Sequence, residues 1–250
     1  MDVQISVEDT VGRVVRHVGG SLVSDLLPAG VDLPKNADFV FQQYGVVAEL
    51  KRLEKDQSED REMAAKIQQL YQNWIVRRKA VPVGYGRFKL NVRNLPPDCA
   101  NELISLYREP IARRIRTANR QIKSSKRTLE MEDAIGLLLL AQDGDYSIGP
   151  EAVLNLASRC LKGGQFRGID DIIHFNANVP ATRPGDPLGY TFWTHACRDK
   201  RRTIPSELIQ SLSDAWHAEL ERAAGRPIPI VVLDKPIEFL DALQFPKARR

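Results

Sequence analysis

Two largely apolar segments, separated by a segment with helical spacing, constrain the fold of this chain most strongly. Residues 134–141 read AIGLLLLA, and residues 171–175 read DIIHF. Short apolar runs without alternation are typical of strands that are covered on both faces. Between them, Pro150 occupies a first-turn position of a helix that we expect to end before Gly163. A strand, a helix and a strand in this order predict a parallel crossover in an α/β sheet.

The rest of the chain predicts elements that fit such a sheet. Ser6 is a favourable N-cap for a helix over residues 7–27, which the pair Gly19 and Gly20 can bend or split. Segments 37–41 and 46–51 flank a four-residue turn that contains glycine, and they predict a β-hairpin. Further expected elements are long helices at 58–79 and 100–129, the latter with a kink at Pro110, strands at 87–92 and 191–196, the last at a sheet edge, and a peripheral helix at 205–224.

Length and composition limit the class of protein. A chain of 250 residues corresponds to one large domain. We divide it into an α/β core at 1–176, with a basic helical segment at about 100–130, and a C-terminal extension at 177–250, packed on the core and ending in a basic tail. No apolar run approaches the ~18 residues of a membrane span, and no secretory signal is visible. The three scattered cysteines form no disulfide framework, which predicts a cytoplasmic protein.

The net charge of +4 hides a strong asymmetry along the chain. Residues 1–50 carry a net charge of −4, residues 51–130 carry +10, and residues 131–250 carry −2. A basic middle between acidic segments is typical of proteins that bind a polyanion. Solvated helix faces can carry a similar bias, so this pattern gains weight only together with a site.

The hairpin places two acidic residues opposite each other. A symmetric turn about residues 43 and 44 puts Asp38 directly across from Glu49 on one face. Like charges that face each other about 5 Å apart destabilise a sheet unless something compensates them. A divalent cation such as Mg²⁺ compensates two carboxylates well. Lys51 follows Glu49 by two residues, so it points to the same face.

This arrangement predicts a metal centre for hydrolysis of a phosphodiester. Asp38 and Glu49 would hold the metal, with the carbonyl of Leu50 as a further ligand. Lys51 would position the attacking water and stabilise the charge that develops on the phosphorus centre. Two alternatives stay open at this point. The three charges can form an ordinary solvated hairpin face, and a three-residue turn would shift the register and turn Asp38 away.

The segment NADFVFQQYGVVAELK at 36–51, between an amphipathic helix and a long helix, resembles the PD-(D/E)XK nuclease superfamily. The resemblance covers about residues 6–80 and extends more loosely through 135–176. It implies a restriction-endonuclease-like mixed β-sheet flanked by helices, here with a long helical insertion and a C-terminal extension. Two features differ from the family pattern. Ala37 stands where many members have proline, and the Gln and Tyr four residues apart in some exonuclease-like branches are absent around Tyr71.

On this resemblance, Asp38 is the motif aspartate, Glu49 the second metal ligand and Lys51 the catalytic lysine. Many members also carry a glutamate in the first helix, and Glu8 is the matching residue. The resemblance implies a Mg²⁺-dependent endonuclease, with Mn²⁺ as an alternative ion and DNA as the expected polymer. A homodimer or a larger defence or repair assembly is left open.

The basic helix at about 107–127 supplies the expected contacts to the phosphate backbone. The cations that we assign to nucleic-acid binding are Arg113, Arg114, Arg116, Arg120 and Lys123. The competing interpretation is a solubilising helix face.

Two other functions remain open: a catalytically silent nucleic-acid-binding module on the same fold, and a metal-dependent phosphohydrolase of small nucleotides. Among the histidines, His174 lies in an apolar strand and is expected to be buried and satisfied, while His195 is a minor functional candidate. Asp143 and Gly144 follow the apolar strand at 135–141, where we expect a turn.

Overall fold

The protein is described from a computed structural model, in which the described residues are 4–27, 36–54, 60–81, 94–144, 147–178, 180–185, 189–229 and 243. The helices and strands, in chain order, are α1 (Val7–His17), β1 (Ser21–Leu22), α2 (Val23–Leu26), β2 (Phe39–Phe41), the 3₁₀-helix η1 (Gln42–Tyr44), β3 (Val46–Leu53), α3 (Arg61–Val76), α4 (Pro97–Thr128), β4 (Ile135–Gln142), α5 (Pro150–Lys162), β5 (Asp171–Asn176), β6 (Ala181–Thr182), β7 (Gly189–Tyr190), β8 (Trp193–Cys197) and α6 (Ser206–Ala224).

Within the described residues, a six-stranded mixed sheet has the order β1-β2-β3-β4-β5-β8. The neighbours β1, β2 and β3 are antiparallel, and so are β5 and β8. The pairs β3–β4 and β4–β5 are parallel. The predicted α/β class is therefore confirmed, together with the parallel crossover from β4 through α5 to β5. The predicted edge strand is β8.

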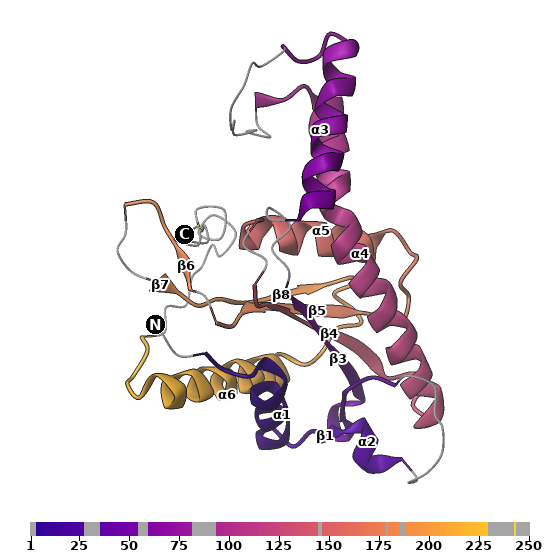
Figure 1. Cartoon of the computed structure of the whole chain (residues 1–250). Helices are drawn as coiled ribbons and strands as arrows, with labels where there is room; N and C mark the ends of the chain where they lie inside the picture. Colours follow the sequence, from indigo (N-terminus) through magenta and orange to yellow (C-terminus); the bar gives the residue numbers. More distant parts are fainter. Residues whose placement is uncertain are drawn as a thin grey trace.

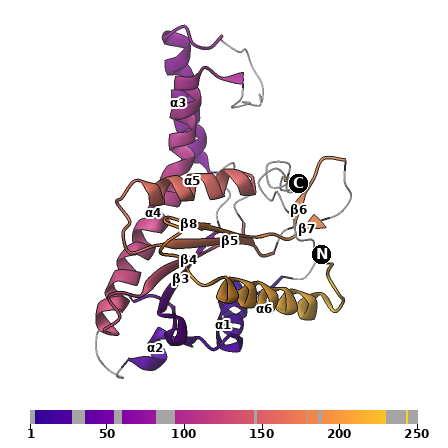
Figure 2. The same ribbon diagram turned by 180° about the vertical axis from the view of Figure 1, so that it is seen from behind.

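Helices cover both faces of the sheet (Figures 1 and 2). On one face, Val11 and Val15 of α1 and Trp216 of α6 form a buried cluster with β3, β4 and β5. On the other face, α4 and α5 pack against the same strands, for example through Ile115 and Val153. Because β4 is covered on both faces, it can carry four leucines in succession.

The hairpin of β2 and β3 has the predicted register. Phe39 pairs with Ala48, and Phe41 pairs with Val46. The four-residue connection is η1 followed by Gly45, whose φ of 59° is left-handed and suits glycine. This turn fixes which face each residue of β3 presents.

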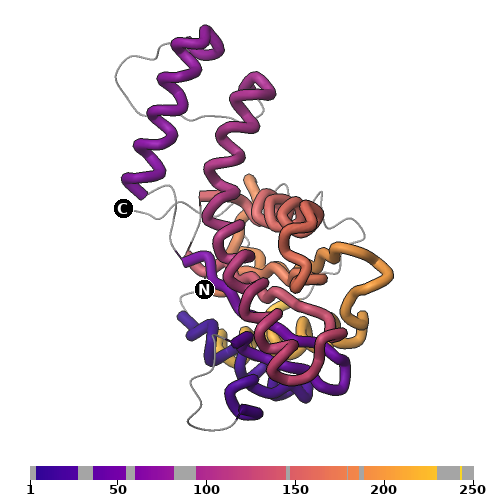
Figure 3. Tube along the Cα trace, turned by 90° about the vertical axis from the view of Figure 1, so that its right-hand side faces the viewer, coloured from indigo at the N-terminus to yellow at the C-terminus, as the bar shows by residue number. Residues whose placement is uncertain are grey.

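The helix α4 is continuous through Pro110, and its two halves pack against different elements. Its second half lies on the sheet, whereas its first half extends beyond the sheet beside α3 (Figures 1 and 3). Trp74 of α3 and Cys99 and Leu103 of α4 are the buried centre of this pair. We call α3 with the first half of α4 (Pro97 to Tyr107) the helical arm.

Three expectations need correction or fall outside the description. The helix predicted over 7–27 is split at the pair Gly19 and Gly20, as the sequence allowed, but the strand β1 that follows the split before the short α2 was not expected. The helix at 205–224 is not peripheral, because Leu208, Leu212 and Leu220 of α6 belong to the sheet's buried core. The predicted strand at 87–92 lies outside the described residues.

Ser6 caps α1 as predicted, since its side chain accepts a hydrogen bond from the amide of Asp9. The three cysteines are free thiols. Within the described part of the chain, none of the helices has the length and hydropathy that crossing a lipid bilayer requires.

Candidate active site

The acidic pair lies at the beginning of β2. Past this point, one side of β3 has no neighbouring strand among the described residues. The register of the hairpin, continued by one residue from Phe39 and Ala48, places Asp38 opposite Glu49. The amide of Asp38 donates a hydrogen bond to Oε2 of Glu49 over 3.1 Å. The amide of Leu50 donates to Oδ2 of Asp38 over 2.8 Å. The two carboxyl groups therefore replace the ladder of backbone hydrogen bonds that would continue between the strands.

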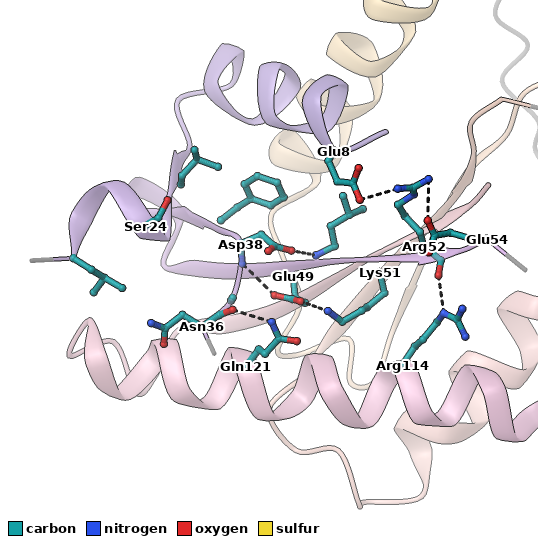
Figure 4. Close-up of a pocket in the computed structure, with 15 residues that line it drawn as sticks. Glu8, Ser24, Asn36, Asp38, Glu49, Lys51, Arg52, Glu54, Arg114 and Gln121 are labelled. Carbon is teal, nitrogen blue, oxygen red and sulfur yellow. Dashed lines mark hydrogen bonds and ion pairs between the residues drawn. The ribbon is translucent and has the colours of Figure 1, made fainter. Parts of the chain in front are cut away.

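Lys51 completes the predicted group (Figure 4). Its Nζ forms an ion pair with Oε1 of Glu49. The side chain of Glu49 is 1% exposed and that of Lys51 is 20% exposed, so this pair is largely removed from water. The structure brings Asp38, Glu49 and Lys51 together, and the solvated hairpin face that we considered does not describe them.

Burial makes this pair of acids a poor place for two negative charges. Burial and the charge of Asp38 raise the pKa of Glu49 to about 8, although Lys51 acts in the opposite direction. Burial also raises the pKa of Asp38, despite the hydrogen bond from the Leu50 amide and the charge of Lys51. The two carboxyl groups thus hold a proton more tightly than exposed acids do, and further positive charge beside them would favour their ionised forms.

The carbonyl group of Leu50 faces the open side of β3. In a strand, the N–H and C=O of one residue point to the same side, and the Leu50 amide points toward Asp38. Two residues further on, the carbonyl of Arg52 also points outward, because it accepts a hydrogen bond from Arg114 of α4. A backbone oxygen therefore stands on the same side as the two acids.

The site opens into a cavity of about 720 Å³. Its walls come from α1, from Leu22 and Ser24 beside β2, from β3, and from α4. The lining mixes apolar surface with both signs of charge, including the acid pair, Arg114 and the exposed Glu54. A cavity of this size and polarity is typical of a small-ligand or substrate site.

Glu8 lies at this cavity, where its charge contributes to the raised pKa of Asp38, but its carboxylate is bound by Arg52. Its Oε1 accepts a hydrogen bond from Nη1 of Arg52 over 2.8 Å, as Figure 4 shows. Arg52 also binds Oδ2 of Asp143 over 2.6 Å and approaches Glu54. The structure thus places the first-helix glutamate in an ion-pair network rather than beside Asp38.

The basic residues of α4 divide into two groups. Arg114 lines the cavity, where it donates to the carbonyl oxygens of Arg52 and Pro110. The other four cations that we assigned to nucleic-acid binding are exposed on α4 and do not line the cavity: Arg113, Arg116, Arg120 and Lys123.

Sequence reasoning missed several residues at the cavity. Gln121 donates from its side chain to the carbonyl of Asn36 over 2.9 Å. The side-chain oxygens of Asn36 and Gln121 are buried, and no residue in the described part of the chain donates a hydrogen bond to them. Gln121 follows Arg114 by seven residues, two helical turns, which is the one pattern that could have paired them. Arg52 and Asp143 gave no such pattern, because their contact depends on the end of β4 lying beside β3.

The remaining candidates from the sequence make contacts that indicate structural roles. His174 is fully buried, as predicted, and its Nε2 contacts Oε1 of Gln142 over 3.2 Å. Its Nδ1 has no partner among the residues that the structure describes, so in this part of the chain the ring is only half satisfied. His195 contacts the buried Asp171 over 2.6 Å at the edge strand β8, away from the acid pair. Asp143 is at a bend after β4, as expected for a turn.

Among the described residues, no group of three or more His, Cys, Asp or Glu side chains gathers in a way that could hold a metal ion. What the candidate site offers is two carboxylates and the carbonyl of Leu50. Mg²⁺ commonly takes one or two carboxylates and completes its shell with water and phosphate oxygens, so these residues fit it better than a larger ion.

Comparison with known proteins gives no match: no family model, no curated protein and no solved structure is similar to this chain. The function must therefore be argued from the site itself.

Proposed function

We propose that the protein is a Mg²⁺-dependent nuclease that hydrolyses phosphodiester bonds, with DNA as the expected polymer. The observation that carries this proposal is the buried Asp38–Glu49 pair with Lys51 on the open edge of β3. The order of elements supports a restriction-endonuclease-like core, since an acid at β2 and Glu-x-Lys on β3 are followed by a helix and the parallel strand β4.

Each residue has a role that its position supports. Asp38 and Glu49 would hold the ion with the Leu50 carbonyl, because all three lie on the open side of β3. A bound Mg²⁺ polarises a phosphoryl oxygen and lowers the pKa of a coordinated water. Lys51 is partly exposed at the cavity. It would break its ion pair with Glu49 and then orient the attacking water and stabilise the charge at phosphorus.

The cavity gives independent support. The amide oxygens of Asn36 and Gln121 are buried acceptors that receive no hydrogen bond from the described residues. A hydrated cation or a bound nucleotide supplies donors of that kind. Buried polar atoms without partners are rare in folded proteins, so their position at this cavity favours a ligand there.

The experiment is a cleavage assay with a matched control. Plasmid DNA, single-stranded DNA and RNA are incubated with wild type, Glu49→Gln or Glu54→Gln, in Mg²⁺, Mn²⁺ or EDTA. Glu54 is an exposed carboxylate on the same cavity, so it controls for local charge. We expect metal-dependent cleavage by wild type and Glu54→Gln, and a loss of about 100-fold or more in Glu49→Gln. Equal, metal-independent cleavage by all three proteins would contradict the proposal.

A second candidate is a metal-dependent phosphohydrolase of small nucleotides, which the cavity of about 720 Å³ favours because it can enclose a nucleotide. Charge reversal on the exposed face of α4 distinguishes the nuclease from the phosphohydrolase of small nucleotides. The double variant Arg113→Glu with Arg120→Glu should strongly reduce the activity of a nuclease that acts on long polymers. It should leave the activity of an enzyme with small substrates unchanged.

A further inference from the structure

A basic surface lies on the structure outside the cavity, and it is assembled from three separate parts of the chain. Its residues are Arg120, Lys123 and Arg127 of α4, Arg167 between α5 and β5, and Arg198 and Arg201 after β8. All are exposed except Arg198, which is partly buried. We call these six residues the basic surface.

The three parts are held together by hydrogen bonds. The amide of Gly168 donates to Oδ1 of Asn119 over 2.8 Å, which fixes the loop before β5 against α4. Arg198 donates to the carbonyl of Phe166 in the same loop. Figure 3 views this side of the molecule and shows α4 crossing in front of the segment that leads into β5. Arg167 thus stands between the cations of α4 and those that follow β8.

The charges of the basic surface are available to a partner. Arg120, Lys123 and Arg127 are spaced by three and four residues and share one exposed side of α4. Neither these three nor Arg167 and Arg201 form an ion pair with a carboxylate in the part of the chain that the structure describes, whereas the neighbouring Arg202 is paired with Asp170. Arg198 and Arg202 also contribute to lowering the pKa of Lys126, mainly a result of burial.

We propose that this basic surface binds the phosphate backbone of a nucleic-acid segment that lies outside the cleavage site. Arg114 and Gln121 face the cavity from α4, and Arg120 and Lys123 lie next to them on the exposed side of the same helix. A polymer held at the cavity therefore reaches the basic surface by crossing α4. The proposal rests on the proposed function for the nature of the polymer, and its binding term is sequence-independent.

The test measures binding without cleavage. Affinity for a DNA duplex of about 40 base pairs is measured by fluorescence anisotropy in EDTA, over a series of KCl concentrations. The variant Arg167→Glu with Arg201→Glu is compared with wild type and with Arg16→Glu with Arg61→Glu. The second pair is exposed on α1 and α3, outside the basic surface, and gives the same net charge. Thermal melting confirms that both variants are folded.

We expect Arg167→Glu with Arg201→Glu to weaken binding about tenfold or more at low salt and to reduce the slope of log K against log [KCl] by about 2. The control variant should bind like wild type. Equal affinity losses in the two variants, or no loss in the first, would overturn the proposal. Binding of polyglutamate as tight as that of DNA would also overturn it, in favour of an acidic protein partner.

Because no divalent ion is present, the assay does not depend on catalysis. A protein that binds DNA through the basic surface but never cleaves it would leave this inference standing and remove the proposed function. If instead the protein cleaves DNA, and Arg167→Glu with Arg201→Glu changes neither activity nor affinity, the proposed function stands and this inference is removed.

Discussion

Lys51 and Glu49 stand two residues apart on β3, yet their surroundings give them different duties. Glu49 is almost fully buried and touches both the Asp38 amide and Lys51. Lys51 is partly exposed at the cavity, and its ammonium group has no acceptor with which to coordinate a cation. The two residues should therefore separate metal binding from chemistry.

We predict that Lys51→Gln reduces nuclease turnover about 100-fold or more while it leaves Mn²⁺ affinity nearly unchanged. Glu49→Gln should weaken both, because it removes a ligand. Single-turnover cleavage gives the rate, and titration of Mn²⁺ by electron paramagnetic resonance gives the affinity. If Lys51→Gln lowers Mn²⁺ affinity as much as Glu49→Gln does, the division of roles is wrong.

His174 provides a pH-dependent term in stability. Complete burial lowers its pKa to about 3, from an ordinary value of 6.5. Between pH 6.5 and 3, His174 is therefore protonated in the unfolded chain but not in the folded chain. Its contribution to stability is full above pH 6.5 and falls as the pH drops toward 3. The slope for one group is at most about 1.4 kcal/mol per pH unit.

We predict that His174→Gln, which keeps a donor toward Gln142, is less sensitive to acid than wild type between pH 6.5 and 4. At pH 5 the benefit relative to pH 7 should be about 2 kcal/mol. Urea unfolding at each pH measures it, with the exposed His17→Gln as control. Parallel curves for wild type and His174→Gln would show that His174 titrates normally.

At the scale of elements, the second half of α4 is tied to the open side of β3. Nε of Arg114 donates to the carbonyl of Arg52 over 2.6 Å, at a point where none of the described strands supplies a donor. This contact holds α4 against the strand that carries Glu49 and Lys51. Arg113, next along the helix, is exposed and offers a matched comparison.

We predict that Arg114→Ala costs about 1–3 kcal/mol of unfolding free energy, because it leaves a partly buried carbonyl without its donor. Arg113→Ala should change stability by less than about 0.5 kcal/mol. Chemical denaturation of both variants measures the difference. A similar small effect for both would mean that water replaces Arg114 at the Arg52 carbonyl.

The elements also show what sequence can and cannot predict. The pairing of Asp38 with Glu49 followed from the symmetry of a short turn and the period of a strand, which are local rules. The engagement of Glu8 by Arg52 was not predictable, because it depends on α1 and β3 meeting across the fold. The apolar face of α6 was visible, but nothing local indicated that it covers the sheet beside α1.

At the scale of the whole molecule, the buried centre of the helical arm is distinct from the clusters on the two faces of the sheet. The centre of the arm contains Trp74, which is 1% exposed. Nε1 of Trp74 donates to Glu102 over 2.9 Å, and Arg77 binds the same carboxylate. In the described part of the chain, α4 is the element that belongs to both the arm and the sheet, so the packing of the arm should be able to open locally.

We predict that Trp74→Ala destabilises the arm by about 3–5 kcal/mol and leaves the sheet folded. Hydrogen exchange is the appropriate measurement, because it reports each element separately. Amides of α3 and of the first half of α4 should exchange faster, while those of β4 keep their protection. Val76→Ala, at a side chain that is 83% exposed, is the control. If β4 loses protection together with α3, the arm and the sheet unfold as one cooperative unit, and α4 transmits the stability of the arm to the strands of the site.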